Sequence, residues 1–157
     1  MRLAEYTDYT LRVLMYCAAN RDRLVTIAEI ADSYAVSKNH LMKIVNDLAR
    51  QGVLATTRGR GGGLQLLKSP KDIVIGDVVR ASETDFRLVE CFDKETNTCS
   101  ISADCRLRGL LDGALAAYFR QLDSATLADI VRPAPLARAR AQPARGRLVP
   151  IPVRSRG

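Results

Sequence analysis

Residues 27–52 read IAEIADSYAVSKNHLMKIVNDLARQG, two helical patterns separated by a short break, and this stretch decides the fold. Thr26 just before it and Glu29 within it have the spacing of a capping box, in which a hydroxyl and a carboxylate each satisfy an unpaired backbone amide. A short helix ending near Tyr34 should follow. After a tight turn, residues 37–51 predict a longer helix, because apolar side chains recur there at helical spacing. The pair predicts a helix-turn-helix, whose second helix enters the major groove of DNA.

The longer helix has an apolar face and a polar face. The apolar face, which we expect to join the core, consists of Leu41, Ile44, Val45 and Leu48. Ser37 can cap this helix and Gly52 can end it. The candidates for DNA contact are Ser37, Lys38, Asn39, His40 and Lys43. The lysines are expected to contact phosphates, while Asn39 or His40 could read base edges. His40 could in principle act as a catalytic base, but nothing near it supplies a nucleophile.

Two β-prone runs follow, at residues 53–57 and 64–67, and the segment RGRGGG joins them. Glycine supplies the backbone conformations that a tight hairpin needs, so this region predicts a β-hairpin wing with a basic tip. The glycines could instead merely loosen the tip, but the arginines beside them favour insertion into a narrow groove or contact with phosphate. The candidates for DNA contact are Arg58, Arg60, Gly61 and Gly62. Helix, helix-turn-helix and hairpin in this order predict a winged-helix domain.

The flanking segments predict a mainly α-helical chain with one small β-wing. Residues 3–19 and 75–82 have helical apolar spacing, and a long apolar stripe runs from residue 105 to 122 beside the small residues Gly109, Gly113 and Ala117. Such a stripe exposes too much apolar surface to stand alone, so we assign it to a dimer interface. The expected parts are a winged helix-turn-helix domain (1–83), a cysteine-bearing loop (84–104), a dimerisation helix with a short C-terminal helix (105–131) and a basic, disordered tail (132–157).

The formal net charge of +7 hides a strong segregation of charge. Residues 132–157 contain seven arginines and no acid, so residues 1–131 carry 17 basic and 17 acidic residues. Within that neutral body, residues 33–71 have seven basic residues and one acid, while residues 72–131 have six basic residues and eleven acids. One basic face on an otherwise acidic body is expected of a protein that docks on phosphate. The arginine tail could add nonspecific DNA affinity or only solubility.

No feature of the chain indicates a membrane protein, a secreted protein or an enzyme. No apolar run approaches the ~18 residues that a membrane span needs. The N-terminal MRLAEYTDYT lacks the apolar stretch of a signal peptide. No substrate-binding or catalytic constellation is evident. We therefore expect a cytoplasmic protein that is not an enzyme.

Three of the four cysteines, Cys91, Cys99 and Cys105, have the spacing C-x7-C-x5-C with no histidine nearby. In the reducing cytoplasm, such a group is more often metal-binding or redox-active than a set of disulfides. Thiolates suit iron–sulfur clusters or zinc, but structural zinc usually takes four Cys or His ligands. A redox pair with a spare thiol, or three unrelated surface cysteines, are alternatives. Cys17 lies on an apolar helix face and is expected to be a core thiol.

Four segments together resemble the NsrR family of nitric-oxide-responsive iron–sulfur repressors, winged-helix proteins of the same family as IscR. These segments are YTDYTLRVLMY, IAEIADSYAVSKNHLMKIVNDLARQG, RGRGGGLQL and IGDVVRASETDFRLVECFD. The resemblance covers roughly residues 1–131 and leaves out the tail. The combination of NHLMK in the recognition helix, the glycine-rich wing and the three-cysteine loop is specific, whereas each motif alone would be weak.

The resemblance implies a homodimer that binds a roughly palindromic operator and represses genes of nitric oxide detoxification. It implies an iron–sulfur cluster, [4Fe-4S] or [2Fe-2S], held by Cys91, Cys99 and Cys105. IscR-like members add a histidine close to the last cysteine, which this chain lacks, because its one histidine is His40. NsrR-like members can instead use a carboxylate on the first helix of the partner subunit. Asp8 fits that pattern, with Glu5 as the second choice.

Two rival functions follow from the same residues. A regulator that senses redox state or iron–sulfur status would share the whole architecture and differ only in its effector. An iron–sulfur electron carrier would need the basic helix-turn-helix and wing to be incidental, so those two elements argue against it.

Overall fold

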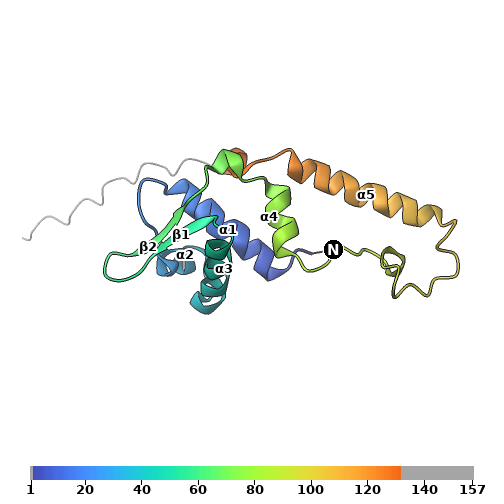
Figure 1. The fold of residues 1–157 in the computed structure, drawn as a ribbon, viewed down its shortest axis with the longest axis horizontal. Helices are drawn as coiled ribbons and strands as arrows, with labels where there is room; N and C mark the ends of the chain where they lie inside the picture. The colour runs from blue at the N-terminus through green and yellow to red at the C-terminus, as the bar shows by residue number, and fades with distance from the viewer. Residues whose placement is uncertain (1, 132–157) are drawn as a thin grey trace, which may run out of the picture.

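The computed structural model describes residues 2–131, so the tail expected at 132–157 lies outside the described residues. The element order is α1 (Glu5–Ala19), α2 (Ile27–Tyr34), α3 (Lys38–Arg50), β1 (Leu54–Thr57), β2 (Gly63–Leu66), η1 (Pro70–Asp72), α4 (Ile75–Ser82), η2 (Glu90–Phe92), α5 (Arg106–Asp123) and α6 (Leu127–Ile130), where η marks a 3₁₀ turn. Figure 1 shows α1 to α4 and the strands gathered at one end, with α5 extending from them as an arm. The mainly helical class with a two-stranded wing is confirmed.

The capping signals in the sequence produce the expected boundaries, with one exception. The Thr26 amide donates to the Glu29 carboxylate at 2.7 Å and the Glu29 amide donates to the Thr26 hydroxyl at 3.1 Å, so the capping box forms. Gly52, just beyond α3, has the left-handed φ of 68° that glycine tolerates. Ser37 occupies the N-cap position of α3, but contrary to our expectation its side chain makes no capping hydrogen bond. The residue is exposed, where water can satisfy the first helical amides.

A single hydrophobic core fills the winged-helix end of the molecule. α3 contributes the expected set of Leu41, Ile44, Val45 and Leu48. α1 contributes Val13, Leu14 and Cys17, and the hairpin contributes Leu54, Leu64 and Leu66. Each of these side chains is at most 5 % exposed. The helix that would enter DNA is therefore fixed from behind by α1 and the wing.

The wing is a short antiparallel hairpin whose second strand is paired on both edges. Leu54 pairs with Leu66 and Thr57 pairs with Gly63 at the two ends of the register. The chain before α2 joins its edge, since the Leu64 amide donates to the Val25 carbonyl at 2.7 Å. Gly63 permits this approach, because an added Cβ would lie 2.6 Å from the Val25 oxygen. β2 is thus paired on both edges near the turn, with β1 on one side and the chain before α2 on the other.

The short C-terminal helix α6 packs into the winged-helix core and not onto the arm. Leu127 is fully buried, and its amide donates to the Ile73 carbonyl at 2.8 Å. The Ile75 amide donates to the Ala125 carbonyl at 3.0 Å. The chain therefore leaves the core after α4, forms the cysteine loop, and returns along α5 to close the core with α6.

A polar joint connects the base of the arm to α4. The Arg80 guanidinium donates to both carboxylate oxygens of Asp123 at 2.7 Å and lies 4.3 Å from the Phe119 ring centroid. This pairing holds the pKa of Asp123 below its usual range. Gly76 leaves the necessary room, because an added Cβ would lie 1.8 Å from an Asp123 oxygen. The direction in which α5 leaves the core is therefore set by side-chain contacts as well as by chain connectivity.

Candidate DNA interface and cysteine loop

The expected contact residues of α3 lie on its outer side. Ser37, Lys38, Asn39, His40 and Lys43 are all exposed. The His40 ring stacks near Tyr9 of α1, with 6.4 Å between ring centroids. The Lys43 ammonium lies 5.6 Å from the Tyr6 ring centroid, which favours a cation. Polar and cationic groups thus face solvent along the side of α3 opposite the core.

The wing tip has a defined turn that requires its glycines. Gly59 and Gly61 have left-handed φ angles of 96° and 80°, and the Gly62 amide donates to the Gly59 carbonyl at 3.0 Å. At Gly62 an added Cβ would lie 2.2 Å from the Thr57 carbonyl oxygen. The glycines therefore shape the tip instead of merely loosening it. Arg58, Arg60 and Gly61 are exposed there, and Gly62 is half-buried.

A groove between α3 and the wing contains residues that the sequence patterns did not single out. Its α3 wall includes Asn39, Met42, Lys43, Asn46 and Arg50, and Arg58 joins it from the wing. Met42, Asn46 and Arg50 were missing from the expected contact set. Helical spacing could have found two of them, since Met42 and Asn46 follow Asn39 by three and seven residues. The groove links the two expected contact elements into one surface.

Asp47, the acid on the recognition helix, is tied to α1. The Tyr6 hydroxyl donates to its carboxylate at 2.6 Å, and Arg50 forms an ion pair with the same carboxylate. Burial and the bond to Asp47 raise the pKa of Tyr6 to about 12. The Tyr6 hydroxyl and Arg50 hold the pKa of Asp47 below its usual range. This Tyr6–Asp47 clamp fixes α3 against α1 and offsets the one negative charge on the basic surface.

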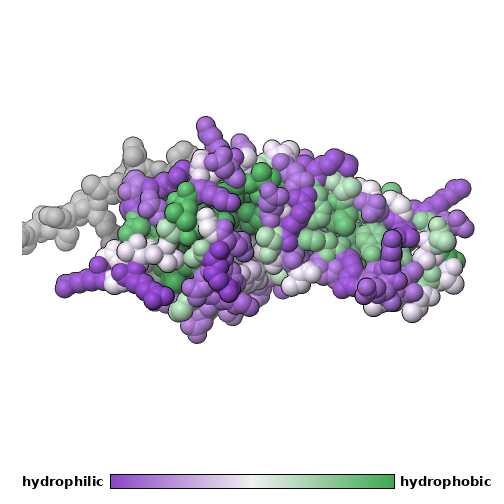
Figure 2. Space-filling model, in the orientation of Figure 1, coloured by the Kyte–Doolittle hydropathy of each residue, from purple (hydrophilic) through white to green (hydrophobic). Residues whose placement is uncertain are grey.

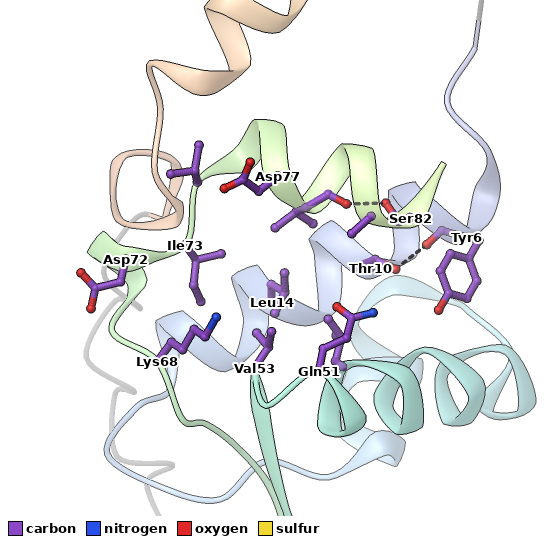
Figure 3. Close-up of a pocket in the computed structure, with 14 residues that line it drawn as sticks. Tyr6, Thr10, Leu14, Gln51, Val53, Lys68, Asp72, Ile73, Asp77 and Ser82 are labelled. Atoms are coloured by element: carbon purple, nitrogen blue, oxygen red, sulfur yellow. Dashed lines mark hydrogen bonds between the residues drawn. The ribbon is translucent and has the colours of Figure 1, made fainter. Parts of the chain in front are cut away.

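A cavity of about 200 Å³ lies behind the recognition helix, between α1, α4 and the end of α3 (Figure 3). Leu14, Val53 and Ile73 form much of its wall. The hydroxyls of Thr10 and Ser82 donate to backbone carbonyls of their own helices, each at 2.7 Å. Tyr6, Gln51, Lys68, Asp72 and Asp77 also line the cavity, so its wall combines an apolar part with polar side chains.

The cysteine loop presents three reduced thiols at its surface. Cys91, Cys99 and Cys105 are free and half-buried, and none forms a disulfide. Cys91 lies in the turn η2, and Cys105 occupies the N-cap position of α5. Cys17, by contrast, is 2 % exposed in the core, and burial raises the pKa of its thiol to about 12. The structure thus separates the three loop thiols from the core thiol, as the sequence predicted.

Hydrogen bonds between Glu90 and Thr98 close the part of the loop that separates its first two cysteines. Glu90 accepts a hydrogen bond from the Thr98 hydroxyl at 2.6 Å and another from the Thr98 amide. These bonds hold the pKa of Glu90 below its usual range. Cys91 directly follows Glu90 and Cys99 directly follows Thr98. The long spacing between these thiols is therefore taken up by a hydrogen-bonded closure. A hollow at the start of α5 places Phe92 and Cys105 on a common wall.

Asp8, the expected fourth ligand, lies on α1 and is half-buried. Arg12 pairs with its carboxylate at 2.8 Å and lies 5.7 Å from the ring centroids of both Tyr9 and Tyr34. Glu5, the second choice, is exposed one turn earlier. In residues 2–131 of this single chain, no three Cys, His, Asp or Glu side chains converge into a metal-binding group. The chain alone therefore does not bring Asp8 and the three loop cysteines together.

The arm carries a hydrophobic surface that nothing in the described chain covers. α5 has no buried residue, and Leu107 and Leu110 are 59 % and 70 % exposed. Gly109 and Gly113 have no neighbouring atom within 4 Å of an added Cβ. Figure 2 shows hydrophobic surface over this arm. Across residues 2–131, none of the helices has the length and hydropathy to cross a membrane.

Comparison with known proteins matches this chain to one family model, to relatives of similar sequence and to solved structures of the same fold. Residues 3–133 match the family model Rrf2, described as an iron-dependent transcriptional regulator. The HTH-type transcriptional regulator NsrR of Bacillus licheniformis is 52 % identical over 132 residues, covering 83 % of this chain and 92 % of that protein. The Bacillus subtilis protein of the same name is 51 % identical, covering 84 % and 91 %. The structure of T. potens IscR aligns with a TM-score of 0.64 at 22 % identity, covering 82 % of this chain and 85 % of that one.

Proposed function

The chain belongs to the Rrf2 family of transcriptional regulators, and we propose that it is a homodimeric repressor that senses nitric oxide through an iron–sulfur cluster. It is a DNA-binding regulator and not an enzyme. Its operator would be a roughly palindromic duplex, since a two-fold dimer presents two equivalent recognition helices. The controlled genes would serve the response to nitrosative stress, and its compartment would be the cytoplasm.

The observation that carries the proposal is the exposed polar face of α3 beside a basic, glycine-shaped wing. The lysines and arginines of this surface suit phosphate, and Asn39 and Asn46 can exchange hydrogen bonds with base edges. The relatives named NsrR share about half of the residues over almost the whole described chain. Their likeness extends through the cysteine loop, which supports the same kind of effector here.

The donor chemistry of the loop fits an iron–sulfur cluster. Three reduced, partly exposed thiols on a loop with little regular structure can turn toward a common centre. Cys91, Cys99 and Cys105 would hold the cluster, and Asp8 of the partner subunit would supply the remaining ligand. Asp8 would first have to leave the ion pair with Arg12. Whether the cluster is [4Fe-4S] or [2Fe-2S] is decided by iron and sulfide analysis.

Dimerisation would bury the surface that α5 leaves open. Leu107 and Leu110 would face the equivalent helix of a second copy, and the small residues beside them would permit close approach of the two backbones. A dimer of this kind would also bring α1 of one protomer near the cysteine loop of its partner. The ligand set that a single chain does not assemble would then be complete.

Contacts already present in the chain could transmit a structural change from the cysteine loop to the DNA-binding surface. When bound, an iron–sulfur cluster supplies an iron centre that reacts with nitric oxide. The loop leads directly into α5, and Arg80 and Asp123 join α5 to the winged-helix end. A change in the loop would therefore alter the spacing and angle of the two recognition helices. Such a switch needs a difference in operator affinity between the two states.

Anaerobic purification followed by a visible spectrum, iron and sulfide analysis and titration with nitric oxide tests the proposal. We expect a coloured protein with stoichiometric iron and sulfide, whose spectrum bleaches and whose operator affinity falls as nitric oxide is added. A spectrum that responds only to oxygen or reductants would instead support a redox regulator. A colourless protein after reconstitution would contradict the cluster, and DNA binding without sequence preference would contradict the regulator.

The variant Cys99→Ala should lose the chromophore and sequence-specific binding together, because one ligand of the cluster is removed. Cys17→Ala is the matched control, since it removes a buried thiol that does not belong to the loop. The control should keep the chromophore and the operator affinity even if it unfolds at a lower temperature. Tight operator binding by Cys99→Ala without a chromophore would refute the coupling between cluster and DNA.

A further inference from the structure

Met42 is an exposed apolar side chain on a surface that is otherwise polar and basic. It is 49 % exposed, whereas the other large apolar residues of α3 are buried in the core. The remaining exposed large apolar residues of residues 2–131 lie elsewhere, at Leu67, Ile101, Leu107, Leu110 and Ile130. An exposed methionine on a recognition helix therefore needs an explanation from the partner that this helix meets.

The neighbours of Met42 identify that partner. Asn39, Lys43 and Asn46 share its groove wall on α3, and Arg58 faces them from the wing. Asn39, Met42 and Asn46 follow the three- and four-residue spacing that keeps side chains on one helix face. Three cations and two amides around one thioether complement a phosphate backbone and base edges, and they do not complement an apolar protein surface. The one acid of this lining, Asp47, is already paired with Arg50 and the Tyr6 hydroxyl. The occupant of this groove is therefore duplex DNA and not a second copy of the chain.

Within the major groove, one apolar group is available to Met42. Each base pair presents hydrogen-bond donors and acceptors there, and thymine alone adds a C5-methyl group. Methionine is unbranched and polarisable, so it can adapt to a methyl group whose position depends on local DNA shape. Asn39 and Asn46 lie on either side of it along the helix and can read the adjacent base edges.

We propose that Met42 is a specificity-determining residue that packs against the C5-methyl group of a thymine in each operator half-site. This assignment rests on the proposed function as an operator-binding repressor. In the groove, the apolar side chain of Met42 would then contact one base between the bases contacted by the amides of Asn39 and Asn46. The recognition helix then discriminates thymine from cytosine at that position without a hydrogen bond to either base.

Replacing thymine by deoxyuridine tests the contact, because this change removes the methyl group and leaves the base-pair hydrogen bonds intact. The operator is first obtained by selection from a random duplex pool with the cluster-loaded protein. Each thymine of a half-site is then replaced singly, and the dissociation constant is measured by fluorescence anisotropy. At one position we expect about fourfold weaker binding, the factor for one methyl-sized group, and about sixteenfold when both half-sites are replaced.

Met42→Ala should bind the thymine operator about fourfold more weakly per half-site and should lose the preference for thymine over deoxyuridine at that position. Met42→Leu should keep most of the preference. Leu67→Ala, another exposed apolar residue but outside the groove, should leave the preference unchanged. Because Met42 is half-exposed, its variants should fold, which circular dichroism checks.

The outcomes of these experiments distinguish a failed methyl contact from a failed operator-binding function. If the wild-type protein selects no sequence from the pool, the operator-binding function itself fails, and with it the contact. If an operator is selected but no deoxyuridine position weakens binding, the methyl contact is overturned while the regulator stands. The methyl contact is likewise overturned if Met42→Ala keeps the full thymine preference of the wild type.

Discussion

The winged-helix end and the arm of this molecule are held by different means. In the winged-helix end, apolar side chains from α1, α3, the wing and α6 are buried against one another. In the arm, α5 has no buried side chain, and the loop before it is organised by hydrogen bonds and ion pairs. The first region can be stable through its own contacts, whereas the second leaves its apolar surface open.

On the proposed function, this difference separates DNA recognition by the winged-helix end from effector sensing by the arm. A surface that reads DNA must be rigid before it binds, and α3 is fixed by the core and by the Tyr6–Asp47 clamp. A region that responds to an effector must have two arrangements of similar free energy. The arm is held by exposed polar bonds, each of which contributes little to stability, so little free energy opposes its rearrangement.

Truncating a core residue of α3 should give the largest effect. Ile44→Ala removes a fully buried side chain, and we expect it to lower the free energy of unfolding by about 2–5 kcal/mol. Urea denaturation of the cluster-free protein measures this loss. Leu110→Ala on the arm is the comparison, and it should change the unfolding of a monomeric sample by less than about 1 kcal/mol. Equal losses at both positions would show that the two regions form one cooperative core.

A charge on the apolar face of α5 should weaken the dimer more than it weakens the fold. Leu110→Glu places a carboxylate at a position that is 70 % exposed in the single chain and would be buried in the dimer. Desolvation of that charge should raise the dimer dissociation constant by about a hundredfold. Sedimentation equilibrium measures this constant. Asp112→Ala, which changes an exposed charge on the side of α5 opposite Leu110, should leave this constant nearly unchanged. If Leu110→Glu leaves the dissociation constant unchanged, α5 does not form the interface.

Breaking the clamp between α1 and α3 should give the smallest effect and one that depends on pH. Tyr6→Phe removes the hydrogen bond to Asp47 and should cost about 1 kcal/mol of stability at neutral pH. The pKa of Tyr6 is raised from 10.0 to about 12 in the folded protein, so the contribution of its protonated hydroxyl is complete below pH 10. It should disappear as the pH rises from 10 to 12.

The measurement is the difference in unfolding free energy between wild type and Tyr6→Phe as a function of pH. Tyr118→Phe is the control, because it removes a phenolic hydroxyl that forms no hydrogen bond within the described part of the chain. A difference that stays constant through this pH range would mean that the Tyr6 bond does not exist in solution.

Sequence patterns predicted the winged-helix end in detail because its determinants are local. The capping box at Thr26, the apolar face from Leu41 to Leu48 and the glycines of the wing tip each specify a backbone conformation or a buried face. The Tyr6–Asp47 clamp was not predictable, since it joins residues 41 positions apart. Met42, whose DNA contact is proposed above, was not among the candidates on α3, because these were chosen for polar or basic side chains.

For the cysteine loop, the sequence predicted which side chains could act as ligands but not the conformation of the loop. The spacing of its thiols identified the donor set, but few apolar residues lie between Cys91 and Cys105 to define how the loop folds. Its closure by Glu90 and Thr98 depends on exposed polar bonds that no sequence period encodes. The convergence of the proposed ligands would further depend on a second protomer.

The separation of charge along the chain has a consequence for the rate at which the protein finds DNA. Residues 33–71, which hold α3 and the wing, contain seven basic residues and one acid, while residues 72–131, which hold α4, the arm and α6, contain six and eleven. The body is thus neutral in sum, but its excess of cations is confined to the segment of α3 and the wing. In the field of a polyanion this asymmetry exerts a torque that turns the surface of α3 and the wing toward the DNA before contact. The fraction of encounters that are productive rises accordingly, and added salt, by shortening the range of the field, removes this orienting effect before it removes the contacts themselves.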